Sequence, residues 1–331
     1  MPSGFHHFSS YLPCLTCFDR LRSHTDWWDG VYATPLGKDE ENEVDLIDAC
    51  KANDIDTVLT LIGDNIQKSA VNLDCRISIN HPNHPIYSRK RRTVMFENSA
   101  FHIVCEAGFL ELVQYFIKRE ECNFHTTNME NQTPLHSAAA NDHLQVVKLL
   151  VREQKVPNML NEVDRLGRTP LYVAAQKGHY DVLSFLVTQT FRKKAVVDAR
   201  ARNLSTPLIA AARNGHYDCV KLLIKNSADT EAAMLKGLRP LHASAIAGSL
   251  KQCEFLIEEA NVDINSVDDF NRTAFFFSCQ QENYELVKFF SSYDACDMKI
   301  ACGFSYTGQE SLLAKNNKKI GFYVRDLQRK R

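Results

Sequence analysis

The feature that most constrains the fold of this chain is a sequence pattern that recurs every 33 to 37 residues. The stretch KGHYDVLSFLV at 177–187 returns almost unchanged as NGHYDCVKLLI at 214–224. The segments before them match too, RTPLYVAAQ at 168–176 and STPLIAAAR at 205–213. The same start occurs six times, with its leading position at Ser99, Thr133, Thr169, Thr206, Arg239 and Thr273. A period of this length indicates an array of small structural units.

Each start is followed by a block with apolar residues at helical spacing, such as HLQVVKLLV at 143–151 and SLKQCEFLI at 249–257. The units therefore resemble ankyrin repeats, with Thr-Pro-Leu-His, an Ala-Ala pair, Gly-His and Val-x-Leu-Leu in their places. The resemblance covers roughly 44–63 and 97–328. It implies an all-α fold, an ankyrin-repeat solenoid of stacked antiparallel helix pairs with short β-hairpin fingers. It also implies that His136 and His242 hydrogen-bond between neighbouring repeats.

The residue types at fixed positions explain how one unit folds. Thr at the helix start can cap a backbone N–H, and the following Pro suits a first turn that needs no donor. The pair Ala174-Ala175 keeps the inner helix slim, and Gly178 supplies the conformation that ends it. One helix pair cannot bury its apolar stripe alone, so the units must stack.

The expected segment boundaries lie where the repeat pattern begins, is interrupted and becomes degenerate. We expect an N-terminal tail and acidic linker at 1–43, an N-terminal capping repeat at 44–63, an inserted loop with basic residues, Pro and His at 64–96, ankyrin repeats at 97–306, and a degenerate C-terminal capping repeat with a basic tail at 307–331. In the start TAFFFSC, Ala274, Phe275 and Phe276 replace the usual Pro, Leu and His. Distortion is therefore expected, if anywhere, in this unit.

The inserted loop contains a basic cluster, Arg89, Lys90, Arg91 and Arg92. Such a cluster fits a nuclear-import signal or a phosphate-binding patch. A solvated loop is the favoured interpretation, since charge runs keep loops in water. We therefore expect a cytoplasmic protein, with a nuclear one as the alternative.

The cysteines indicate a reducing compartment. The chain has 11 of them without regular spacing, whereas secreted scaffolds usually pair theirs. Cys14-x-x-Cys17 lacks the second pair of ligands that a zinc site needs. Acylation of Cys14 and Cys17 would anchor the chain to a membrane, but a tail that packs on the first repeat or awaits a partner is preferred.

Composition and motifs argue against catalysis and nucleic-acid binding. A net charge of −1 over 331 residues does not suit a chain that mainly neutralises phosphates. The sequence shows no phosphate-cradling glycine loop, zinc-protease helix motif, nucleophile elbow or kinase signature. We therefore predict no catalytic residue, no cofactor and no metal site.

The expected working surface is the concave side of the stack, where the fingertips lie. Large apolar side chains there are interspersed with basic ones, which fits a partner segment with apolar and acidic residues. The alternative is that the tips pack only on one another. The predicted partner-binding residues are Met95, Phe96, Met129, Arg165, Leu166, Arg202, Leu235, Lys236 and Phe270. The predicted groove floor is Ile103, Val173, Arg213, Ile246 and Phe277.

Two function classes follow. The favoured one is a non-enzymatic scaffold or adaptor that binds another protein through this groove. The alternative is a substrate-recognition subunit of a multi-subunit enzyme such as a ubiquitin ligase. The C-terminal FYVRDLQRKR at 322–331 matches no docking box for such a complex, which disfavours the alternative.

Overall fold

The computed structural model describes residues 48–52, 54, 56–57, 99–118, 126–153, 159–188 and 195–297. Residues 48–52 are helical and lie within the predicted N-terminal cap. The segments predicted at 1–43, 64–96 and 307–331 lie outside the described residues, and with them Cys14, Cys17, the basic cluster at 89–92, Met95 and Phe96.

The described repeats are helix pairs that succeed one another along the chain. The pairs are α3 (Ala100–Ala107) with α4 (Leu110–Lys118), α5 (Pro134–Ala140) with α6 (Leu144–Arg152), α7 (Pro170–Lys177) with α8 (Tyr180–Thr188), α9 (Pro207–Arg213) with α10 (Tyr217–Lys225), α11 (Pro240–Ile246) with α12 (Leu250–Glu258), and α13 (Ala274–Gln280) with α14 (Tyr284–Ser292). A single 3₁₀ turn, η4 (Leu235–Gly237), lies between α10 and α11. No β-strand element occurs in the described ranges.

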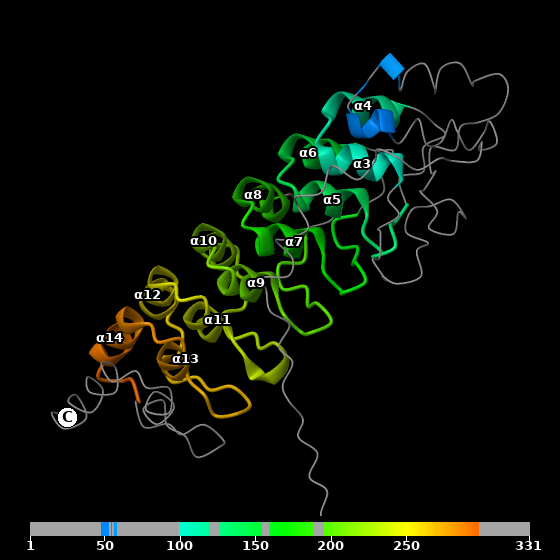
Figure 1. Ribbon diagram of the computed structural model, residues 1–331. Helices are drawn as coiled ribbons and strands as arrows, with labels where there is room; N and C mark the ends of the chain where they lie inside the picture. The colour runs from blue at the N-terminus through cyan, green and yellow to red at the C-terminus, as the bar shows by residue number, and fades with distance from the viewer. Residues whose placement is uncertain are drawn as a thin grey trace, which may run out of the picture.

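The helices form two parallel rows in an elongated stack (Figure 1). The inner row is α3, α5, α7, α9, α11 and α13, and the outer row is α4, α6, α8, α10, α12 and α14. Each helix contacts its own partner and its neighbours in the same row, and loops extend from one side of the inner row. This is the predicted all-α solenoid. The fingers are hairpin-shaped turns, without regular strands in the described part.

The inner helices begin as the sequence pattern predicts. The hydroxyl of Thr169 accepts a hydrogen bond from the backbone N–H of Tyr172 at 3.2 Å, and Pro170 occupies the first helical position. Thr206 and Pro207 repeat the arrangement in the next unit. Each cap satisfies a backbone donor that has no partner inside the helix.

The core lies between repeats rather than within one. Ala174 and Ala175 are fully buried, as are Val182 and Leu183 on the outer helix. Small side chains on the inner helix let the next inner helix approach closely, while the branched side chains fill the space beneath the outer row. Stacking therefore supplies the apolar burial that a single pair could not provide.

Buried histidines link one repeat to the next, as the family resemblance implied. Nε2 of His136 lies 2.9 Å from the carbonyl oxygen of Arg168, and Nε2 of His242 lies 2.9 Å from that of Ser266. His102, which the sequence analysis had not singled out, lies 2.9 Å from the carbonyl oxygen of Gln132. These contacts join α3, α5 and α11 to the backbone of the following repeat.

The unit that begins TAFFFSC is regular, not distorted. Thr273 caps α13 by accepting from the N–H of Phe276 at 3.3 Å, and Phe275, Phe276 and Phe277 are all buried. The imidazole of His242 meets the ring of Phe277 edge-on at 5.8 Å between centroids. Aromatic packing therefore replaces the Pro-Leu-His contacts in this unit.

Candidate functional site

The fingertips share one pattern of backbone hydrogen bonds. In the finger at 164–168, the N–H of Asp164 donates to the carbonyl of Arg168 at 3.0 Å, and the N–H of Gly167 donates to the carbonyl of Asp164 at 2.9 Å. The same two bonds close the fingers at 128–132, 201–205, 234–238 and 268–272. Two central residues therefore project from each tip, and we call their series the fingertip row: Met129/Glu130, Arg165/Leu166, Arg202/Asn203, Leu235/Lys236 and Asp269/Phe270.

Successive tips are joined by their backbones. The N–H of Arg165 donates to the carbonyl of Glu130 at 2.7 Å, and the N–H of Arg202 donates to that of Leu166 at 2.8 Å. Leu235 bonds to Asn203 and Asp269 to Lys236 in the same way, at 2.9 and 3.1 Å. The fingertip row is thus a continuous hydrogen-bonded edge that fixes the spacing of its side chains.

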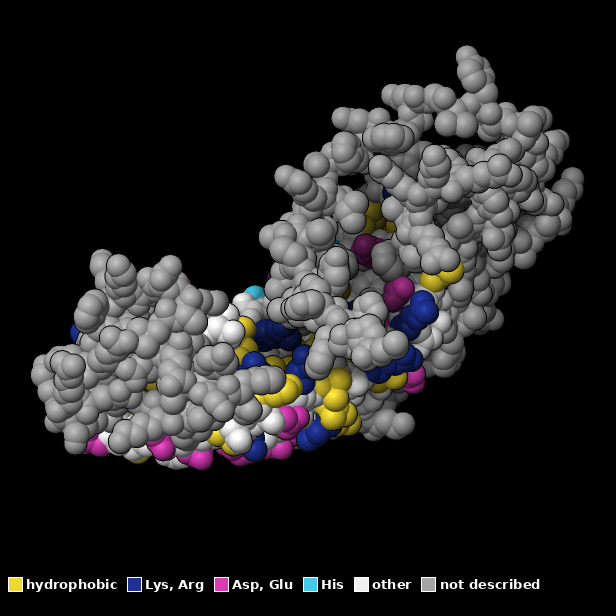
Figure 2. All heavy atoms as spheres, turned by 60° about the horizontal axis from the view of Figure 1, so that its bottom comes forward, with side chains coloured by type: hydrophobic (Ala, Val, Ile, Leu, Met, Phe, Trp, Pro, Cys, Tyr) yellow, Lys and Arg dark blue, Asp and Glu magenta, His cyan; other side chains and the backbone are white. Residues whose placement is uncertain are grey.

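The side chains of the row combine exposed apolar and basic groups. Met129 is 45% exposed, and Leu166 and Leu235 are each 51% exposed. Arg165, Arg202 and Lys236 are exposed beside them. Figure 2 shows hydrophobic and basic side chains gathered side by side on the face that presents the fingers. A row of this kind can hold an extended segment that carries apolar and acidic residues.

Phe270, like Glu130, is only half exposed, whereas the other tip residues are exposed. The guanidinium of Arg272 lies 4.9 Å from the centroid of its ring and 4.7 Å from that of Phe277. This cation–π stack ties the last described finger to α13.

The predicted groove floor is partly wrong. Val173 and Phe277 are each only 4% exposed, so they cannot line an open floor. Ile103 and Ile246 are half-buried, and Arg213 is exposed. The fingers, rather than these inner-helix positions, carry the larger accessible side chains.

Two fingers are held by a buried ion pair that the sequence analysis missed. Oδ1 of Asp164 accepts from the N–H groups of Leu166 and Arg168 at 2.9 and 2.8 Å, while Oδ2 accepts from Nε of Arg168 at 2.7 Å. Asp268 and Arg272 repeat this arrangement. The signal was available in the sequence, as an Asp followed four residues later by an Arg in both fingers.

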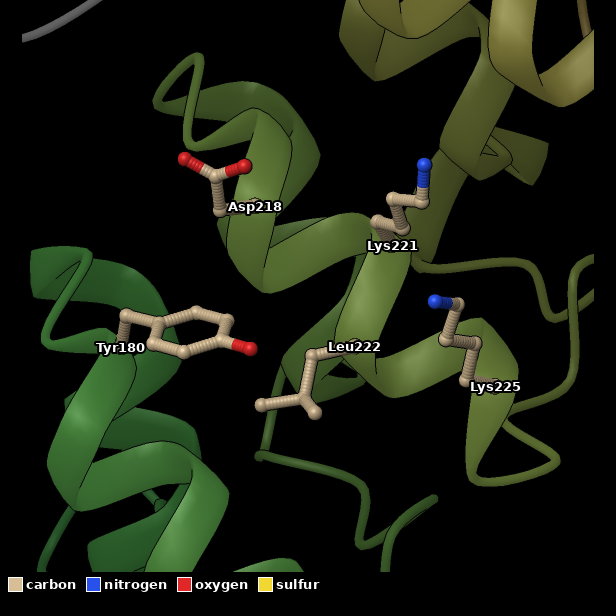
Figure 3. A pocket seen from close by; sticks show the side chains of 5 residues that line it. All are labelled: Tyr180, Asp218, Lys221, Leu222 and Lys225. Carbon is tan, nitrogen blue, oxygen red and sulfur yellow. The ribbon is translucent and has the colours of Figure 1, made fainter.

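A pocket that sequence reasoning did not find lies on the outer helices, away from the fingers (Figure 3). It has a volume of about 440 Å³ and is lined by Tyr180, Asp218, Lys221, Leu222 and Lys225. Tyr180 projects from α8 toward α10, which supplies the other side chains. The ammonium of Lys221 also lies 5.5 Å from the centroid of the Phe255 ring. This pocket mixes one carboxylate with two cations.

The described residues hold no group of three or more His, Cys, Asp or Glu side chains placed to bind a metal ion. Among the same residues, no helix combines the length and apolarity that a membrane crossing requires.

This chain is similar in sequence to known proteins with ankyrin repeats. The family model for ankyrin repeats in three copies matches at 46–159, 101–196, 157–234 and 187–268. The chain is 26% identical over 217 residues to NAD-dependent deacetylase sir2B of Dictyostelium discoideum, covering 65% of this chain and 27% of that protein. It is 26% identical over 200 residues to a transient receptor potential cation channel subfamily A member 1 homolog of Caenorhabditis elegans, covering 60% of this chain and 16% of that one.

A shorter relative is protein phosphatase 1 regulatory subunit 27 of Mus musculus, 32% identical over 100 residues, which are 29% of this chain and 62% of that protein. The chain thus covers less than two thirds of each of these relatives. The family model matches well over half of the chain, between residues 46 and 268. Together with the stacked helix pairs and the interrepeat histidines, this match shows that the chain belongs to the ankyrin-repeat family.

Proposed function

We propose that this protein is a non-enzymatic scaffold or adaptor that binds another protein through the concave side of its ankyrin stack. Membership of the ankyrin-repeat family supports a role in protein–protein interaction. The observation that carries the finer proposal is the fingertip row, in which Met129, Leu166 and Leu235 are exposed on a hydrogen-bonded edge.

The proposed partner segment is apolar and acidic. Arg165, Arg202 and Lys236 would attract carboxylates, while the apolar side chains would lose water on contact. One acidic neighbour weakens the positive electrostatic potential of the row, since Glu130 lies 3.9 Å from the guanidinium of Arg165. The Arg165 side chain is 65% exposed and that of Glu130 24%, so water and salt weaken this long pair and a partner can displace it.

Binding rather than catalysis is the activity that we assign. The sir2B alignment covers 27% of that deacetylase, and its name describes the whole protein. The described cysteines are buried, and the buried histidines His136 and His242 use both ring nitrogens in structural contacts. These groups therefore act as packing and linking elements in our proposal. We further propose a cytoplasmic location.

The test is affinity purification of the full chain with quantitative mass spectrometry. The variant Leu166→Ser/Leu235→Ser should lose the specific partner, because truncating central contacts costs roughly 2 kcal/mol or more. Its fold should remain, since fingertips lie outside the interrepeat core. Lys225→Glu, in the outer-helix pocket, is the matched control and should keep the partner.

The opposite pattern would overturn the proposal. If Lys225→Glu loses the partner while the fingertip variant keeps it, the protein works through its outer face. Cullin-type subunits that co-purify in stoichiometric amounts would instead favour the ubiquitin-ligase alternative.

A further inference from the structure

Two features of the finger at 201–205 stand out: it lacks the carboxylate brace, as does the finger at 234–238 with Met234 at that position, and its fourth residue differs from that of every other described finger. In the fingers at 164–168 and 268–272, a buried carboxylate holds the turn through backbone N–H groups and an Arg. Ala201 occupies the equivalent position here, as shown by its N–H bond to the carbonyl of Ser205 at 3.0 Å. An alanine side chain cannot make these bonds, so this finger lacks the buried brace.

The second feature is Leu204. The fourth residue of each finger has a positive φ, and in the other described fingers it is Asn131, Gly167, Gly237 or Asn271. Leu204 has a φ of 61° at this position. Among the described non-glycine residues with positive φ, it is the only one with an apolar side chain. Asn and Gly tolerate the left-handed region, whereas a leucine there is strained.

The strained side chain is also exposed. Leu204 is 41% exposed, next to the tip residues Arg202 and Asn203 and beside the finger of Leu166. Val163, at the base of that neighbouring finger, is 44% exposed. Burial therefore does not explain why an apolar residue is kept in a costly conformation. Backbone strain that is not offset by burial is typical of functional positions.

We infer that Leu204 is a specificity-determining anchor for the partner segment. Its finger lies between those of Leu166 and Leu235, so that three successive fingers each carry an exposed leucine. Two of these fingers also carry an exposed arginine, Arg165 and Arg202. The occupant that fits is an extended peptide segment with apolar residues separated by Asp or Glu. This inference rests on the proposed function and names one residue that determines its partner class.

Because Leu204 is strained, replacing it should change stability and binding in opposite directions. Replacing Leu204 by Asn, the residue that two other fingers use, removes the backbone strain and the apolar contact together. Leu204→Asn should therefore raise the thermal midpoint by about 2 °C or more while it weakens binding by about tenfold or more. Leu166→Asn is the matched control: it removes another exposed fingertip leucine without relieving strain, so it should weaken binding without raising the midpoint.

The experiment uses the labelled full chain on an array of synthetic peptides. One half combines Leu, Ile and Phe with Asp and Glu, and the other half combines the same apolar residues with Lys and Arg. We expect the wild-type chain to prefer the acidic half, Leu204→Asn to lose that signal, and Leu204→Met to retain it because the apolar bulk remains.

Two failures are distinguishable. If Leu204→Asn keeps the signal while Leu166→Ser/Leu235→Ser loses it, the inference about Leu204 is overturned and the proposed groove stands. If the wild-type chain shows no preference for the acidic half, or if the fingertip variant binds as the wild type does, the proposed function fails as well.

Discussion

The Nε2 atom of His136 lies 2.9 Å from the backbone carbonyl oxygen of Arg168 in the next repeat. Its Nδ1 atom accepts a hydrogen bond from the backbone N–H of Thr133 at 3.1 Å. An acceptor at Nδ1 places the proton on Nε2, which donates to the carbonyl. The neutral imidazole therefore closes its own helix start and joins two repeats at once.

This neutral form should make stability fall in mild acid. Burial lowers the pKa of His136 from 6.5 to about 4, against smaller opposing effects of the Arg168 hydrogen bond and Asp164. The unfolded chain takes up the proton first, so this contribution is present above pH 6.5 and is lost as the pH falls toward 4. Between pH 7.5 and 5 we expect a loss of about 2 kcal/mol from this residue.

The measurement is urea unfolding across that pH range, before most carboxylates titrate. His136→Gln lowers stability at pH 7.5 but should make the loss between pH 7.5 and 5 smaller; part of the slope remains because burial also lowers the pKa of His242. A variant with the same slope as the wild type would show that His136 is not the titrating group.

Two glycines allow the cost of a left-handed backbone to be measured separately from the cost of a steric clash. Both have a positive φ, but a Cβ would clash at only one of them. Gly178 and Gly215 have φ values of 81° and 79°. A Cβ on Gly178 would lie 2.5 Å from Nδ1 of His216, whereas one on Gly215 would meet nothing within 4 Å. Gly215→Ala should cost about 1 kcal/mol and Gly178→Ala clearly more, because the His216 ring must also move.

Urea midpoints of the two variants test this difference. Adding His216→Ala should recover part of the Gly178→Ala loss, since the clashing ring is gone. Equal losses in both single variants would contradict the close packing of Gly178 on His216.

The buried ion pair of Asp164 and Arg168 should be worth more than a surface pair. The Asp164 side chain is 1% exposed and the Arg168 side chain 21%, and Nη2 lies 2.7 Å from Oδ2. Arg168→Met should cost about 2 kcal/mol, because a desolvated carboxylate loses its counter-charge while keeping two backbone donors. Glu130→Gln, at the longer and partly exposed pair with Arg165, should cost well under 1 kcal/mol, because the two charges are 3.9 Å apart and the arginine lies largely in water. Chemical denaturation of both variants decides whether burial sets the difference.

The described cysteines should resist alkylation while the protein is folded. Desolvation raises the pKa of Cys219 to about 11 and that of Cys50 to about 12. At pH 7.5 the reactive thiolate is scarce and access is blocked. Iodoacetamide treatment followed by peptide mass spectrometry should show these two residues labelled only after urea is added. Rapid labelling of Cys219 in the native protein would contradict its burial.

Charge reversal in the fingertip row should act mainly on the rate of association. Arg165→Glu/Arg202→Glu should slow binding of a partner recovered by affinity purification, and the difference should shrink at high salt. Surface plasmon resonance at two salt concentrations measures both effects. Lys225→Glu is a better control than a change at Lys221, because Lys221 packs over the rings of Tyr217 and Phe255.

The period, the helix pairs and the positions of the fingertips could all be predicted from the amino-acid sequence. These features rest on short-range chemistry, such as Thr169 capping α7 and Gly178 ending it. Because each tip has the same offset from its Thr-Pro start, the residues from Met129 to Phe270 could be assigned to tips from spacing alone. His136 and His242 could be assigned to interrepeat contacts for the same reason.

Side-chain contacts between neighbouring repeats could be seen only in the folded stack. Val173 and Phe277 are buried rather than open, the phenylalanines of α13 pack in a regular unit, and Leu204 is exposed with a left-handed backbone. Each outcome depends on side chains from a neighbouring repeat or on a dihedral angle that the local pattern does not encode. A repeat motif specifies how one unit folds, whereas the surface left for a partner is set by how adjacent units fill the space between them.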